Sequence, residues 1–190
     1  MTEQEAKAVL EAALLAADKP IDVEQLHAVL EEYPPARIRE LLIQLQHECL
    51  AQGRGIRVVE VAGGFQLVTD PAWAERLSRL YRRIRLARLS RPSLETLAIV
   101  AYRQPITRVE IEDIRGVDVS GVLQHLLERC LIRVVGRKEG VGRPLLYGTT
   151  SEFLERFGLK SLETLPRLAE FHEPETVVTH EKPETTPTAD

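Results

Sequence analysis

The apolar positions of the chain follow the same order twice. In each copy, three segments carry apolar residues three and four positions apart, and two short β-branched segments follow them. The first spacing places apolar side chains on one face of a helix, and the second pattern is typical of strands. The order therefore predicts an α+β fold, mostly α, built from two similar modules.

The more distinctive copy lies in the second half of the chain. Its first helix is expected to begin near Ser90 and to end before Pro105, because the residue preceding a proline is disfavoured in helical conformation. The apolar face of this helix consists of Leu94, Leu97, Ala98 and Ala101. A second helix over 108–115 should end at Gly116, and Asp118 or Ser120 can cap a third. Strands at 132–135 and 145–147 would form a hairpin around a glycine-rich loop.

The N-terminal copy has the same layout. Thr2 and Glu5 have the spacing of a capping box ahead of a helix that should end near Asp18. A second helix over 23–30 and a longer helix after Pro34 follow. The next two strand-like runs are separated by Gly63-Gly64, which predicts a tight hairpin at these glycines.

Short identical strings support a repeat. Residues 56–59 and 132–135 are both Ile-Arg-Val-Val, Pro20-Ile21 matches Pro105-Ile106, and Cys49-Leu50 matches Cys130-Leu131. We interpret the chain as tandem winged helix-turn-helix domains, the first over 1–75 and the second over 92–158. The alternative is that two unrelated α+β pieces share these strings by chance.

A basic linker helix is predicted between the modules, over residues 76–91. Trp73, Leu77, Leu80 and Ile84 form its apolar stripe, and this range holds seven arginines and no acidic residue. These charges can bind phosphates or an acidic partner, or they can form a solvated face. The possible contacts, including two in the second hairpin, are Arg76, Arg79, Arg82, Arg83, Arg137 and Lys138.

A last short helix is predicted after the second hairpin. Thr149 and Glu152 have capping-box spacing before it, and Gly158 should end it. Residues 166–190 then turn to glutamate, proline and threonine, with six acidic and two basic residues. Such a composition predicts a disordered acidic tail, because it buries too little apolar surface to offset the cost of ordering.

Composition bounds the remaining possibilities. The 190 residues are 44% apolar, which is enough for a buried core, and the net charge is −4. No apolar run approaches the ~20 residues that span a bilayer, so we expect a cytoplasmic protein. Cys49 and Cys130 each lie on the apolar stripe of a helical pattern, which predicts core thiols in a reducing compartment.

The sequence offers no sign of catalysis. The five histidines are scattered, and the metal-binding, nucleophile-elbow and phosphate-loop motifs are missing. Glu110, Glu112 and Asp113 cluster on one predicted helix, where a solvated face explains them better than acid–base chemistry. We therefore expect no enzyme, no catalytic residue, no cofactor and no metal.

Along residues 89–158 the sequence resembles the bacterial segregation and condensation protein B (ScpB) family. The resemblance rests on SLETLAIVAYRQPITRVEIEDIRGV and LIRVVGRKEGVGRPLLYGTTSEFLERFGL, which include Gly116, Gly136 and the Gly142-Arg143-Pro144 turn. It implies a tandem winged-helix fold and no catalytic activity. It also implies a homodimer formed chiefly by the N-terminal module.

The same resemblance implies a partner, the kleisin subunit ScpA. Through this kleisin the chain would join an SMC ATPase complex in chromosome condensation and segregation, associated with the nucleoid, with indirect DNA contact and no membrane contact. Winged-helix surfaces without base-reading residues suit a peptide segment laid in a groove. We hypothesise that the groove includes Leu94, Leu97, Tyr102, Arg143, Leu145 and Tyr147.

The alternative function is that of a winged-helix DNA-binding transcriptional regulator. A DNA reader needs polar and basic residues on the outer face of its third helix. In the second module this face has an acidic residue beside its single arginine; its residues are Ser120, Gln124, His125, Glu128 and Arg129. The sequence favours the kleisin partner over DNA reading.

Overall fold

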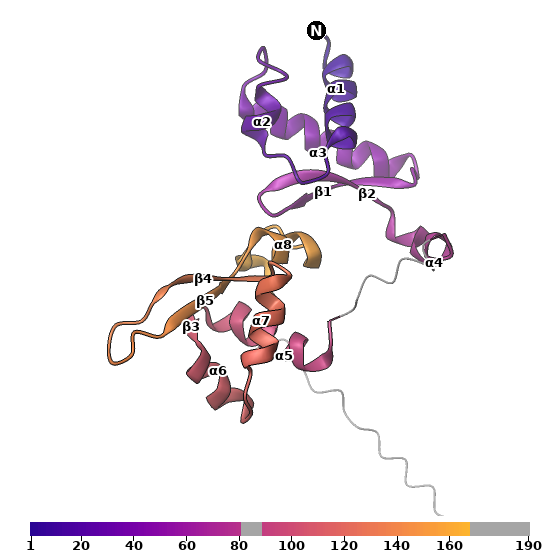
Figure 1. Cartoon of the computed structure of the whole chain (residues 1–190). Helices are drawn as coiled ribbons and strands as arrows, with labels where there is room; N and C mark the ends of the chain where they lie inside the picture. The colour runs from indigo at the N-terminus through magenta and orange to yellow at the C-terminus, as the bar shows by residue number, and fades with distance from the viewer. Residues whose placement is uncertain (81–88, 168–190) are drawn as a thin grey trace, which may run out of the picture.

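The computed structural model describes residues 1–80 and 89–167, which form two helical halves that each carry a β-hairpin (Figure 1). The N-terminal half covers residues 1–70 and the C-terminal half residues 89–167. The two halves have separate hydrophobic cores. The described chain is a mixed, mostly helical α+β structure, as predicted.

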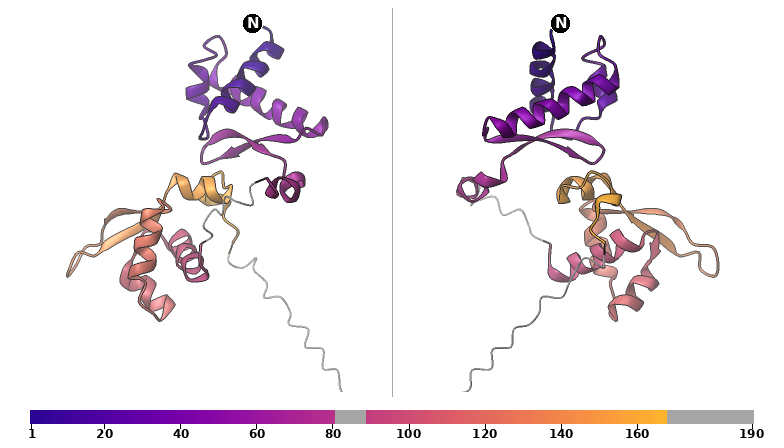
Figure 2. Two further views of the ribbon diagram at one scale, coloured as in Figure 1. Left: turned by 45° about the vertical axis from the view of Figure 1, so that its right-hand side comes forward. Right: turned by 180° about the vertical axis from the view of Figure 1, so that it is seen from behind.

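The N-terminal half consists of α1 (Glu3–Ala16), α2 (Val23–His27), α3 (Pro35–Ala51), β1 (Ile56–Val61) and β2 (Gly64–Thr69). Thr2 closes the predicted capping box with Glu5 at the start of α1. The C-terminal ends of α1 and α2 were predicted slightly too late, since α1 ends at Ala16 and α2 at His27. The three helices pack over the hairpin (Figure 2). The core between them includes Leu10, Leu26, Ile38 and Leu42 from the helices and Phe65 from β2.

The hairpin turn is Ala62-Gly63, not the predicted Gly63-Gly64. Both turn residues have positive φ, 51° for Ala62 and 80° for Gly63, which suits a two-residue hairpin turn. Gly64 is instead the first residue of β2, and the backbone of Ile21 packs directly against it. A Cβ at Gly64 would lie 2.8 Å from the Ile21 carbonyl oxygen. Gly64 is therefore needed for a close approach of two backbones.

The linker helix predicted over 76–91 lies only partly within the described residues, where its helical part is short. After a 3₁₀ turn, η1 (Pro71–Trp73), α4 spans only Ala74–Ser78. The amides of Arg79 and Leu80 bond to carbonyls three residues earlier, which ends the helix. Residues 81–88, with Arg82, Arg83 and Ile84, lie outside the described residues.

The C-terminal half has helices α5 (Arg91–Arg103), α6 (Arg108–Arg115), α7 (Ser120–Glu128) and α8 (Ser151–Phe157). Its strands are β3 (Ile106–Thr107), β4 (Ile132–Arg137) and β5 (Leu145–Thr149), and η2 (Leu162–Thr164) follows α8. The antiparallel sheet has the order β3-β5-β4. Residues 104–107, predicted as an extended connection, supply β3, which pairs with β5 at Ile106 and Thr107.

The helix caps in this half agree only partly with the prediction. Gly116 ends α6 in the left-handed conformation, with φ of 68°, as expected. The N-cap of α7 is Val119 without a side-chain bond, although the Asp118 carboxylate accepts the amide of Ser120. Thr150, not Thr149, caps α8, because Thr149 is buried and bonds to Gln104.

One of the two cysteines departs from the prediction of core thiols. Cys49 is buried, but Cys130 is exposed. The end of α7 explains the difference: Cys130 has φ of 55°, and the amide of Leu131 reaches back to the carbonyl of Leu126 at 3.0 Å. This arrangement is a Schellman ending, which turns the residue after the cap outward and buries the next apolar side chain, Leu131.

Two further predictions concern the C-terminal tail and membrane-spanning segments. Residues 168–190, most of the predicted disordered tail, lie outside the described residues. Within 1–80 and 89–167, no helix combines the length and the apolarity needed to cross a bilayer.

Candidate partner-binding surface

An apolar groove lies between α5 and α8 in the C-terminal half. Helix α5 presents one wall, α8 presents Phe153 and Phe157, and the segment after α8 closes the groove. The lining residues are Leu94, Leu97, Ala98, Ala101, Tyr102, Phe153, Phe157, Leu159, Leu165 and Pro166. Leu94 and Phe157 are each 44% exposed, so the groove offers accessible apolar surface to a partner.

The structure brings three of the six predicted partner-binding residues together in this groove: Leu94, Leu97 and Tyr102. Leu97 is only 1% exposed and forms the floor. The Tyr102 hydroxyl donates a hydrogen bond of 2.8 Å to the carbonyl of Pro166, which holds the far wall. Leu94 is therefore the most accessible of the three.

The other three predicted residues lie on the hairpin instead. Arg143 is in the β4–β5 loop, and Leu145 begins β5 opposite Arg137. Tyr147 is 8% exposed and pairs with Ile106 and Val134 in the middle of the sheet. A buried position of this kind makes Tyr147 part of the core. The six predicted partner-binding residues thus lie in two places, the groove and the β4–β5 hairpin.

The wall of the groove opposite α5, formed by α8 and the segment after it, was not predicted from the sequence. Phe153 and Phe157 are four residues apart, and their rings lie 4.9 Å from each other. This spacing was a usable signal, because residues at i and i+4 share a helix face. Leu159 and Leu165 carry no such signal, since they follow α8 in irregular structure.

The predicted basic contacts do not form one patch in the described chain. Arg76 lies over the ring of Trp73, 5.9 Å from its centroid, and shares a shallow hollow with Glu75 and Arg79. Arg82 and Arg83 are outside the described residues. Arg137 and Lys138 belong to the distant hairpin of the C-terminal half.

Lys138 is neutralised by an ion pair. Its Nζ lies 2.6 Å from Oε1 of Glu110, and the hydroxyl and amide of Thr107 donate to Oε2 of the same carboxylate. The bonds from Lys138 and Thr107 lower the pKa of Glu110 from 4.5 to about 2. Glu110 stays ionised at neutral pH and ties the hairpin to α6.

Glu112 likewise serves the fold. It pairs with Arg108 at 2.7 Å and accepts the amide of Val119. Arg108 also reaches Asp118 at 3.0 Å. These bonds connect α6 to the start of α7, so two of the three clustered carboxylates are occupied in structural contacts.

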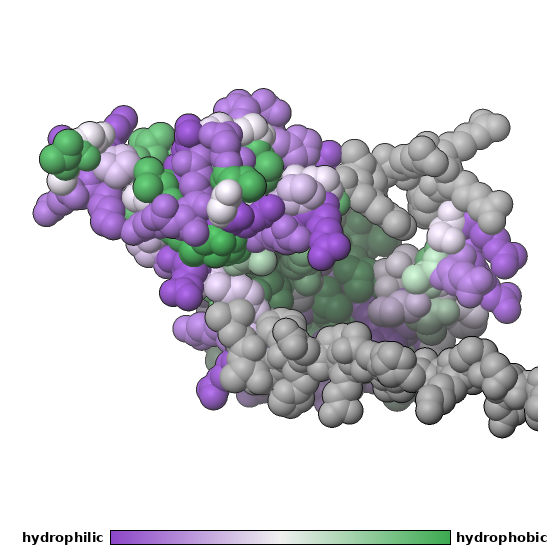
Figure 3. Space-filling model, turned by 90° about the horizontal axis from the view of Figure 1, so that it is seen from below, coloured by the Kyte–Doolittle hydropathy of each residue, from purple (hydrophilic) through white to green (hydrophobic). Residues whose placement is uncertain are grey.

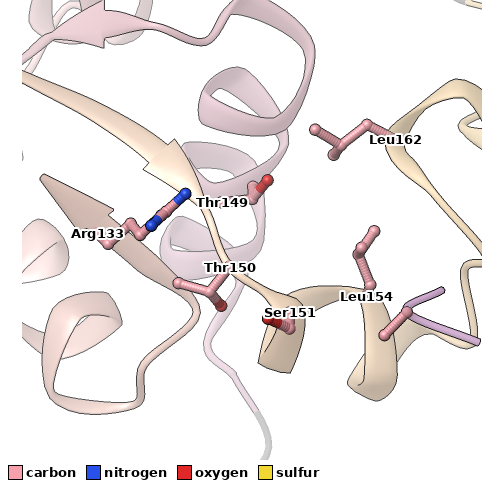
Figure 4. Close-up of a pocket in the computed structure, with 7 residues that line it drawn as sticks. Arg133, Thr149, Thr150, Ser151, Leu154 and Leu162 are labelled. Atoms are coloured by element: carbon pink, nitrogen blue, oxygen red, sulfur yellow. The ribbon is translucent and has the colours of Figure 1, made fainter. Parts of the chain in front are cut away.

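A second cavity lies where the two halves meet. Figure 4 shows the residues of the C-terminal half that surround it: Arg133, Thr149, Thr150, Ser151, Leu154 and Leu162. Ala62 of the N-terminal half completes the lining. The hydroxyls of Thr149 and Thr150 already bond to Gln104 and to the carbonyl of Cys130. These two hydroxyls are therefore occupied in contacts within the C-terminal half.

The exposed surface of the C-terminal half carries separate hydrophobic patches among hydrophilic residues (Figure 3). Exposed apolar side chains include Val109, Ile114, Val117 and, near the hairpin tip, Val141. Among residues 1–80 and 89–167, no group of three or more histidine, cysteine, aspartate or glutamate side chains is arranged to hold a metal ion.

Comparison with known proteins identifies relatives across most of the chain. The family model of segregation and condensation complex subunit ScpB matches residues 8–168. Segregation and condensation protein B of Syntrophotalea carbinolica is 52% identical over 173 residues, which cover 91% of this chain and 87% of that protein. The protein of the same name from Geobacillus kaustophilus is 50% identical, over 87% and 76% of the two chains.

Solved structures give the same family name. ScpB from Mycobacterium tuberculosis is 36% identical, with a TM-score of 0.41, over 84% of this chain and 98% of that one. A dimer of the ScpB N-terminal domain complexed with a ScpA peptide is 36% identical, with a TM-score of 0.38, over 40% of this chain and 95% of the solved chain.

Proposed function

The chain belongs to the family of segregation and condensation complex subunit ScpB, and we propose that it is a non-catalytic subunit of a bacterial SMC–kleisin complex. In this role it supports chromosome condensation and segregation in the cytoplasm, at the nucleoid. The observation that carries the proposal is the family match over residues 8–168, which includes both halves rather than one shared module.

Each half would be a winged-helix domain, the first over 1–75 and the second over 92–158. The order of three helices followed by a hairpin supports this assignment in both halves. In the C-terminal half, β3 adds a third strand to the hairpin, which stabilises it relative to two strands alone.

The N-terminal domain would form the homodimer. A solved dimer of an ScpB N-terminal domain supports this role. The N-terminal half also exposes large apolar side chains on two helices, Leu15 on α1 and Ile43 and Leu50 on α3. Exposed apolar side chains that share one surface are typical of a protein interface, and Ile43 and Leu50 lie two helical turns apart on α3.

The kleisin ScpA would bind this dimer, and the SMC ATPase would join through the kleisin. The groove between α5 and α8 is our candidate for a kleisin contact in the C-terminal domain. A helix with apolar residues on one face can fill a groove of this kind. Leu94 and Phe157 at its rim would supply the accessible anchors.

A pull-down of the tagged chain from its source cells, at moderate salt and with nuclease added, tests the proposal. We expect a kleisin and an SMC ATPase to remain bound, with about two copies of this chain per kleisin. Nuclease is essential, because it separates protein partners from proteins that share only DNA.

A winged-helix transcriptional regulator is the alternative. The arginines of residues 76–91 favour it, whereas the Lys138–Glu110 ion pair weakens the hairpin as a phosphate contact. A regulator would lose its protein partners in the pull-down and would bind duplex DNA with a steep salt dependence, about one logarithmic unit per phosphate neutralised. That result would replace the proposed function.

A further inference from the structure

A turn of the N-terminal half contacts a segment of the C-terminal half nearly one hundred residues later. The amide of Ala62 donates to the carbonyl of Leu159 at 2.9 Å, and the amide of Gly63 donates to the carbonyl of Lys160 at 3.1 Å. Both views of Figure 2 show α8 beside the β1–β2 hairpin. Two consecutive donors thus meet two consecutive acceptors across the junction of the halves.

An ion pair accompanies the two backbone bonds. Nζ of Lys160 lies 2.9 Å from Oε2 of Glu60, and the other oxygen of this carboxylate accepts a bond from Arg39. Partial burial opposes ionisation of Glu60, but the bonds from Lys160 and Arg39 outweigh it and lower the pKa of this carboxyl. Glu60 therefore carries a charge that faces Lys160 at neutral pH.

The N-terminal side of this contact is held in shape before the halves meet. Ala62 and Gly63 have φ of 51° and 80°, and the tight turn points their amides away from the hairpin. Cross-strand pairs from Val61–Gly64 onward fix the turn on β1 and β2.

The C-terminal side is equally ordered. Gly158 ends α8 with φ of 65°, and the amide of Leu159 returns to the carbonyl of Leu154 at 2.9 Å. This Schellman ending fixes the direction of the chain that leaves α8. The side chain of Leu159 lines the apolar groove, so that the same residue serves the groove and the contact.

We propose that Glu60, Ala62 and Gly63 form a latch with Leu159 and Lys160, which holds the two halves of one chain in a fixed relative arrangement. The latch would present the N-terminal helices and the groove between α5 and α8 to a partner as one preorganised surface. Preorganisation lowers the entropic cost of binding a partner that spans both halves. The latch is a property of the single chain and does not depend on the proposed function.

Distance measurement between spin labels on the two halves tests the latch. Glu24→Cys on α2 and Gln124→Cys on α7 place labels on exposed helix positions, in a Cys130→Ser background that leaves only the buried Cys49. An excess of unlabelled protein restricts the signal to distances within one chain. We expect a single narrow distance distribution.

Lys160→Glu removes the ion pair and places two carboxylates together. Lys160 is half exposed, so this variant should fold. We expect its distance distribution to widen at least twofold. Lys138→Glu is the matched control, because it makes the same charge change in an ion pair within the C-terminal half. It should keep the narrow distribution. A broad distribution in the unsubstituted chain, or an unchanged narrow one in Lys160→Glu, would overturn the proposal.

Amide hydrogen exchange gives a second readout in the full chain. The amides of Ala62 and Gly63 lie at a hairpin turn, where exchange is fast unless a bond protects them. We expect both to exchange at least tenfold more slowly in the unsubstituted chain and in Lys138→Glu than in Lys160→Glu. Equal rates in all three proteins would also contradict the latch.

Discussion

The side chain of Gln104 ties the end of α5 to the end of β5 through Thr149. Oε1 of Gln104 accepts the backbone amide of Thr149 at 2.7 Å, and Nε2 donates to its hydroxyl oxygen at 2.9 Å. Thr149 is buried, so these bonds satisfy polar groups that water does not reach. Gly148 leaves room for this contact, since a Cβ there would lie 2.9 Å from Oε1 of Gln104.

Gln104→Ala should destabilise the chain by about 1–3 kcal/mol, because the buried amide and hydroxyl of Thr149 lose their partner. Chemical denaturation measures this change. Gln124→Ala is the control, since Gln124 is exposed and its side chain bonds to Glu128 on its own helix. Its effect should stay within about 0.5 kcal/mol. Equal effects of the two substitutions would show that the contact contributes nothing.

The ion pair of Glu110 predicts a pH dependence. The pKa of Glu110 is lowered to about 2, so its stabilising contribution is complete above its ordinary value of 4.5 and is lost as pH falls toward 2. The difference in unfolding free energy between the unsubstituted chain and Glu110→Gln should therefore shrink between about pH 6 and about pH 3. Glu139→Gln, in the hairpin loop, provides the comparison. A difference that stays constant over this range would refute the assignment.

Binding in the groove predicts a loss of kleisin affinity on substitution at its rim. Leu94→Asp places a charge on apolar surface that a partner would bury, and we expect the affinity for ScpA to fall at least tenfold, about 1.4 kcal/mol. Val141→Asp adds the same charge near the hairpin tip and should leave affinity unchanged. Titration calorimetry distinguishes the two.

A double substitution compares the groove with the hairpin. Tyr102→Ala combined with Leu145→Ala removes one residue from each of the two places that the sequence hypothesis had joined. We expect a loss of more than threefold in ScpA affinity, with most of it from Tyr102→Ala, because Tyr102 lines the groove. Affinity within threefold of the unsubstituted chain would exclude this region as the kleisin contact.

Dimerisation predicts a dependence on the outer face of α3. Ile43 and Leu50 are seven residues apart, two helical turns, and both are exposed on this helix. Ile43→Lys with Leu50→Lys should shift the dimer toward monomer by at least tenfold in dissociation constant, which sedimentation velocity measures. Val29→Lys replaces another exposed apolar side chain and should leave the dimer intact. The opposite pattern would place the interface elsewhere.

The helical periods of the sequence were sufficient for the order of the main helices. On α1, Leu10 and Leu14 are buried at the spacing that the pattern indicated. On α5, Leu97 is buried as predicted, but so is Val100, which lies outside the predicted apolar face. Errors occurred where distant contacts decide the local structure. Gly64 lies in β2 against the backbone of Ile21, and no residue next to Gly64 in the sequence signals this approach.

The candidate surface shows the same limit. Of the residues predicted on the apolar face of α5, Leu97 and Ala101 are buried, whereas Leu94 and Ala98 are exposed and line the groove. Part of the opposite wall depends on the path of the chain after Gly158. That path has no helical or strand period, although Leu159 and Leu165 pack on the core there. The contact between Ala62 and Leu159 had no sequence signal either, because backbone groups alone form it.

Binding of the kleisin by a dimer of this chain is tested most directly by the mass of a reconstituted complex. The purified chain is mixed with ScpA of the same organism, and the mass is measured by light scattering after size exclusion. We expect a complex of two copies of this chain with one kleisin, which persists after nuclease treatment. Separate elution of the two proteins, at concentrations well above the dissociation constants of typical subunit contacts, would contradict kleisin binding.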